Sequence, residues 1–78
     1  MSTAAALSKD QLLRKAEWAR GRSEYYSKLA SEERAKPTNG DWRRARAKDQ
    51  AIRHLDGESF RYRSIADAYL RRAGVPVF

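Results

Sequence analysis

The sequence predicts an all-α fold, in which two long helices form an antiparallel, coiled-coil-like hairpin and a single helical domain covers residues 1–78. Two runs of residues repeat with alternating steps of three and four, the spacing of a helix face that packs against another helix. The first run is Lys9, Leu12, Ala16, Ala19, Ser23, Tyr26, Ala30 and Glu33, and the second is Ala45, Lys48, Ile52, Leu55, Ser59, Tyr62, Ala66, Tyr69 and Ala73. The segment Pro37-Thr38-Asn39-Gly40 separates the runs and is typical of a turn.

The first helix is expected over residues 8–35. Ser8 is a good N-cap, and Gln11 stands three residues later, where it completes a capping box. Leu7 and Leu12 occupy the two positions of a hydrophobic staple. Pro37 prevents the helix from continuing, so we expect a turn at residues 36–40.

The second helix is expected over residues 41–73, with Thr38 or Asp41 as its cap. Gly74 fits the position that follows a helix end, and Val75 would then contact Leu70 in a Schellman motif. Residues 74–78 form an apolar tail, which either packs near Leu13 or acts as a short docking segment.

Gly57 is the weak point of the second helix. A break there would give three helices in place of two. We favour an unbroken helix because the three–four repeat keeps its phase across Gly57, whereas a loop would normally lose it.

Folding the chain at the turn predicts a register for the two helices. The expected layers are Tyr26 with Ile52, Ser23 with Leu55, Ala19 with Ser59, Ala16 with Tyr62, and Leu12 with Ala66. Three flanking contacts fit the same register: Arg20 with Asp56, Arg22 with Glu58, and Arg34 with Trp42.

We call the line along which the two repeating runs meet the seam. It is narrow, and large apolar residues remain beside it. By helical spacing they form one face, made of Trp18, Tyr25, Leu29, Ala47, Ala51, Ile65 and Ala68. Monomers rarely expose a contiguous apolar patch of that size. We therefore expect a homodimer in which two hairpins bury these faces as a four-helix bundle. The alternative is that the tail covers part of the face within one chain.

An arginine stripe follows the outer face of the second helix. It consists of Arg43, Arg46, Arg53, Arg61 and Arg71. Guanidinium groups bind phosphate or carboxylate bidentately, so the stripe is a candidate site for a polyanion or an acidic partner. The alternative is a solvated helix face. Phe60, an apolar residue in a charged neighbourhood, is a candidate partner anchor.

Composition excludes several classes of protein. The 78 residues carry 17 Lys and Arg against 10 Asp and Glu, a net charge of +7 that favours acidic partners. With no cysteine and one histidine, neither a disulfide framework nor a thiolate metal site is available. No glycine-rich phosphate loop or catalytic constellation is present, so we expect no enzyme, no cofactor and no small-molecule substrate. No apolar run reaches the ~20 residues of a membrane span, and the expected compartment is the cytoplasm.

Three functions fit this sequence. The first is a small regulatory or inhibitory module that binds a protein partner through its helical faces, for which a phage-encoded modulator of a bacterial host protein is one form. Abundant arginine and alanine agree with such an origin. The second is a nucleic-acid-binding accessory protein that uses the arginine stripe. The third is a structural or assembly component.

Overall fold

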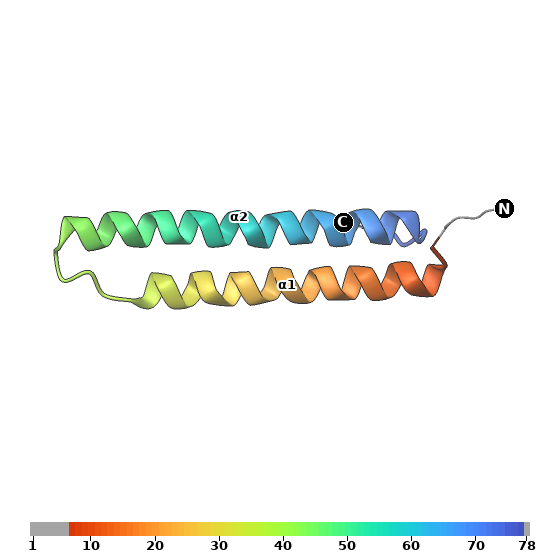
Figure 1. The fold of residues 1–78 in the computed structure, drawn as a ribbon, viewed down its shortest axis with the longest axis horizontal. Helices are drawn as coiled ribbons and strands as arrows, with labels where there is room; N and C mark the ends of the chain where they lie inside the picture. Colours follow the sequence, from red (N-terminus) through yellow and green to blue (C-terminus); the bar gives the residue numbers. More distant parts are fainter. Residues whose placement is uncertain (1–6, 78) are drawn as a thin grey trace.

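The computed structural model describes residues 7–77 and contains two antiparallel helices (Figure 1). Helix α1 spans Lys9–Ala35 and helix α2 spans Trp42–Arg72. The molecule is a rod of 62 × 24 × 16 Å. The expected all-α helical hairpin is confirmed. Neither helix in the described part of the chain combines the length and hydrophobicity that crossing a bilayer requires.

The expected capping box begins α1. The Ser8 hydroxyl accepts a hydrogen bond from the Gln11 backbone N–H at 3.1 Å, and the Ser8 N–H donates to Gln11 Oε1 at 2.9 Å. These bonds satisfy donors that a helix start leaves without partners. Lys36 is already extended, as expected for a residue that precedes proline, so the helix ends before Pro37.

The turn reverses the chain through two residues with positive φ. Asn39 has φ 54° and Gly40 has φ 76°, values that asparagine and glycine tolerate best. The Asp41 N–H donates to the Thr38 carbonyl at 2.9 Å, which closes the turn. Of the two expected caps, Asp41 is the one used, and its Oδ1 accepts from the Arg43 N–H at 2.9 Å.

Helix α2 passes through Gly57 without a break, so the three-helix alternative is wrong. Its end is the expected Schellman motif. Val75 N–H donates to the Leu70 carbonyl at 2.9 Å, and Gly74 N–H donates to the Arg71 carbonyl at 3.0 Å. Gly74 has φ 80°, the left-handed conformation that this motif requires.

The core between the helices is narrow. The buried residues all belong to the two repeating runs, which confirms the faces that meet: Leu12, Ala16, Ala19, Ser23, Ala30 and Ala66. None of these side chains is larger than leucine. The two helices therefore approach closely while burying little apolar area.

The register differs from the expected one by one helical turn. Ser23 lies opposite Ser59, not opposite Leu55. The Ser23 hydroxyl donates to the Ser59 carbonyl at 2.8 Å, and the Ser59 hydroxyl donates to the Ser23 carbonyl at 2.9 Å. A buried hydroxyl without a partner costs about 1–3 kcal/mol, and the Leu55 side chain of the expected layer has no group that could return a hydrogen bond to Ser23. A three–four repeat alone fits registers one turn apart almost equally well, so the serine pair decides between them.

The ion pairs shift with the register. Asp56 pairs with Arg34, not with Arg20 as expected. Both side chains of this pair are about half exposed, and such a pair contributes only ~0–1 kcal/mol. Flanking charges were therefore too weak a guide to the register.

Candidate interaction surfaces

Four aromatic rings form a connected cluster on one flank of the hairpin. Trp18 meets Tyr62 edge-on at 5.7 Å between ring centroids, Tyr62 stacks on Tyr26 at 5.7 Å, and Tyr26 meets Tyr25 edge-on at 5.4 Å. Helical side chains lean toward the N-terminus of their own helix. Tyr26 and Tyr62 each follow one of the paired serines by three residues, so in antiparallel helices they lean toward each other across the seam.

Arg22 lies at the centre of this cluster. Its guanidinium carbon lies 5.8, 5.4 and 5.5 Å from the ring centroids of Tyr25, Tyr26 and Tyr62. One of its terminal nitrogens donates to the Tyr26 hydroxyl at 3.2 Å. Hydrogen bonding to the Tyr62 phenol, followed by the charge interaction with Tyr26, raises the pKa of Arg22 above its ordinary value. The group is therefore a fixed cation held between π faces.

Sequence reasoning missed this role of Arg22, which was expected to pair with Glu58. Glu58 instead makes a 3.9 Å contact with Arg61 on its own helix. The available signal was the spacing of Arg22 from Tyr25 and Tyr26, three and four residues on, which puts the three side chains together on one helix face.

The face predicted as the oligomer interface is partly exposed among residues 7–77. Trp18 is 58% exposed and Tyr25 is 51% exposed. Ala47 and Ala68 are also exposed, while the remaining three residues are half-buried: Leu29, Ala51 and Ile65. We call these seven residues together with Arg22 the aromatic face. The described part of the tail, residues 75–77, leaves both exposed rings open to solvent. A role in dimerisation stays a prediction.

The five residues of the arginine stripe are all exposed. Arg53 contacts Asp49 at 3.1 Å and Arg61 contacts Glu58, so two of the five have an acidic neighbour on their own helix. The Arg43 guanidinium carbon lies 5.6 Å from the centroid of the Trp42 ring, whereas Arg34 was the arginine expected beside Trp42. Within residues 7–77 no ion pair involves Arg46 or Arg71.

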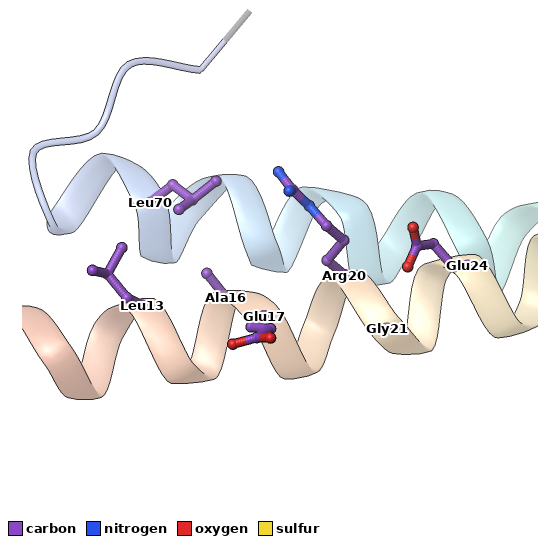
Figure 2. A pocket seen from close by; sticks show the side chains of 7 residues that line it. All are labelled: Leu13, Ala16, Glu17, Arg20, Gly21, Glu24 and Leu70. Atoms are coloured by element: carbon purple, nitrogen blue, oxygen red, sulfur yellow. The ribbon is translucent and has the colours of Figure 1, made fainter.

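The opposite flank carries an open groove of about 600 Å³. Figure 2 shows its lining residues: Leu13, Ala16, Glu17, Arg20, Gly21, Glu24 and Leu70. In this view the described part of the tail, residues 74–77, leaves the end of α2 on the side away from α1, so that part does not pack into the groove beside Leu13. Phe60 is 70% exposed, and its role as a partner anchor stays a prediction.

The candidate surfaces consist of exposed side chains and one open groove. Among the described residues, no group of His, Asp and Glu side chains converges to hold a metal ion. The groove has carboxylates and a guanidinium at its edge but is open along its length (Figure 2). Comparison with known proteins finds no family, no curated protein and no solved structure that matches this chain.

Proposed function

We propose that this chain is a small, non-catalytic regulatory module that binds another protein chain through its aromatic face. The observation that carries the proposal is the cluster of the exposed Trp18 and Tyr25 with the half-buried Arg22. Trp, Tyr and Arg are the residue types that dominate binding energy at protein interfaces. Here all three adjoin one another on a rigid helix pair.

The cluster also has the physical properties of a binding surface. Trp18 contacts Tyr62 edge-on and Tyr25 contacts Tyr26 edge-on, so little side-chain freedom is lost when a partner binds. Arg22 offers positive charge at the centre, and apolar side chains surround it. A protein surface that presents apolar residues around a carboxylate complements this pattern.

Site-specific photo-crosslinking tests the proposal. Tyr25 is replaced by a benzoyl-phenylalanine residue, which keeps an aromatic ring, and the protein is expressed in cells of its natural source. We expect a discrete protein adduct after irradiation. Glu24, which lines the groove on the opposite flank, is the matched control position and should give no such adduct. Equal labelling from both positions, or none from Tyr25, would remove the basis for this function.

Binding of nucleic acid by the arginine stripe is a second candidate. Its support is the exposure of all five arginines along a helix face that is about 42 Å long from Arg43 to Arg71. If each arginine neutralised one phosphate, the affinity for duplex DNA would fall with salt at a log–log slope of about −4.5.

A salt titration with a labelled duplex separates this candidate from the first. Arg46→Glu should weaken the binding and reduce the slope, whereas Lys28→Glu makes the same change of charge on α1, at a position that is also exposed. If both variants behave alike, or if the wild-type chain does not bind at low salt, the stripe is a solvated helix face.

A further inference from the structure

We infer that the aromatic face binds the aromatic face of a second copy of this chain, and that α1 of each copy lies over α2 of the other. This inference rests on the proposed function, because it identifies the protein bound at that face. The result is a four-helix bundle in which every neighbouring pair of helices is antiparallel.

The single hairpin exposes more surface than a compact protein of its size. Its accessible area is 6008 Å² for a mass of 9.0 kDa, whereas a compact monomer of that mass exposes roughly 4,900 Å². The difference, about 1,100 Å², exceeds the ~800 Å² that each partner buries in a standard interface. The radius of gyration of 17.4 Å compares with about 11.5 Å for a compact chain of this length.

The aromatic face has the dimensions that such an interface needs. Helix α1 has 27 residues, so it is about 40 Å long, and two adjacent helices are about 20 Å wide. Their product is about 800 Å². The buried core of six small side chains leaves the hairpin with little packing of its own, which a second copy would supply.

The distribution of large and small residues selects one arrangement of the two copies. On α1 the face presents Trp18, Tyr25 and Leu29, and on α2 it presents mainly alanines. A two-fold axis parallel to the helices places each α1 over the α2 of the second copy, so Leu29 of one copy lies near the level of Ala51 of the other, and Trp18 near that of Ile65. An axis perpendicular to the helices would place α1 over α1, where bulky residues collide and the alanines leave gaps.

Charges agree with this arrangement. The Ser23–Ser59 pair fixes a common level on the two helices. Arg22 and Glu58 each precede one of these serines, so they lie within about 3 Å of each other along the rod. Helix α1 over the second copy's α2 then sets Arg22 of one copy beside Glu58 of the other. The Arg22 Nε is buried and has no hydrogen-bond partner among the described residues, so a carboxylate of the second copy would approach the terminal nitrogens of the guanidinium group.

Cysteine pairing tests the arrangement cleanly, because the chain has no cysteine of its own. Arg14 and Ala68 are exposed and lie on different helices, Arg14 on α1 and Ala68 on α2. Arg14 is nine residues before Ser23 on α1, and Ala68 is nine residues after Ser59 on α2. Because the helices are antiparallel, both residues lie about 13.5 Å from the Ser23–Ser59 pair, in the same direction along the rod. The proposed axis therefore brings Arg14 of one copy beside Ala68 of the other.

The experiment mixes two single variants, Arg14→Cys and Ala68→Cys, under mild oxidation. We expect a disulfide between the two variants. Glu17→Cys mixed with Ala68→Cys is the matched control, since Glu17 is close in sequence to Arg14 but lies on the groove flank, and it should not form a disulfide. Sedimentation equilibrium of the wild-type chain should give twice the 9.0 kDa mass, and Trp18→Ser should weaken the dimer at least about tenfold.

Three outcomes would overturn the inference. The first is a wild-type chain that stays monomeric up to roughly 100 µM. The second is a disulfide between two Ala68→Cys chains in place of the mixed one, and the third is a disulfide between Glu17→Cys and Ala68→Cys that forms as readily as the one with Arg14→Cys. A monomer that still gives an adduct of different mass from the Tyr25 position would sink this inference and leave the proposed function standing. A monomer that gives no adduct would sink both.

Discussion

The paired serines of the seam are the contact through which the register can be tested most directly. Ser23→Ala removes the hydroxyl that donates to the Ser59 carbonyl at 2.8 Å and that also meets the Ser59 hydroxyl at 3.2 Å. Ser59→Ala removes the reciprocal bond of 2.9 Å. Each substitution deletes one bond to a carbonyl and the shared contact between the hydroxyls, and leaves the other carbonyl bond in place, so the two changes are matched.

The size of the effect follows from two opposing terms. An intramolecular hydrogen bond contributes about 1 kcal/mol net, and alanine favours a helix over serine by up to ~0.5 kcal/mol. Each single substitution should therefore lower the free energy of unfolding by about 0.5–1 kcal/mol. Ser27→Ala is the control, because Ser27 is exposed on the same helix. It should raise that free energy by up to ~0.5 kcal/mol.

Urea unfolding followed by far-ultraviolet circular dichroism measures these differences, at one fixed protein concentration because self-association would make stability depend on it. The double variant should lose less than the sum of the single losses, since the two hydroxyls also contact each other. If Ser23→Ala and Ser59→Ala follow Ser27→Ala, the serine pair does not set the register and our account of it fails.

Other substitutions test the helix ends and the seam by the same unfolding measurement. Gly57→Ala should stabilise the protein by about 0.5–1 kcal/mol, since glycine is unfavourable inside a helix and the added methyl group meets open space. Gly74→Ala should destabilise it by about 1–2 kcal/mol, because Gly74 has φ 80°. Equal effects of the two substitutions would contradict the Schellman ending. Ser8→Ala should cost about 1 kcal/mol through loss of the capping box, and no loss would mean that the box does not hold the helix start. Ile52→Asp and Leu55→Asp should each cost at least about 2 kcal/mol because a charge enters the seam, although both positions are only half-buried; wild-type stability of both variants would place these residues outside the seam.

Much of this fold could be predicted from local signals. Capping boxes, turns and glycine ends depend on residues within a few positions of one another. Ser8 with Gln11 was therefore sufficient to predict the start of α1, and Gly74 with Val75 was sufficient to predict the end of α2. The seam faces were equally accessible, since a repeat of three and four specifies which side of a helix is buried. In each case the determining interaction lies within one helix or one turn.

The register could not be predicted in the same way, because it depends on comparing energies between helices. Small residues fill most layers, so a shift of one turn changes little of the apolar burial. What distinguishes the registers is whether Ser23 and Ser59 can form their reciprocal hydrogen bonds. In the repeat of three and four, a serine counts only as a small residue that fills space. In the structure both serines donate hydrogen bonds across the seam.

This single difference also builds the candidate site. In the expected register Tyr26 would have met Ile52, and Tyr62 would have met Ala16. Placing Ser23 opposite Ser59 sets the two tyrosines one on each side of that level, from which they lean together and stack. The stacked pair then provides the surface on which Trp18 and Arg22 rest. The hydrogen bonds between the two serines thus affect which aromatic rings reach solvent. Substitutions that shift the register should therefore abolish the binding that we propose for the aromatic face, although they change no residue in it.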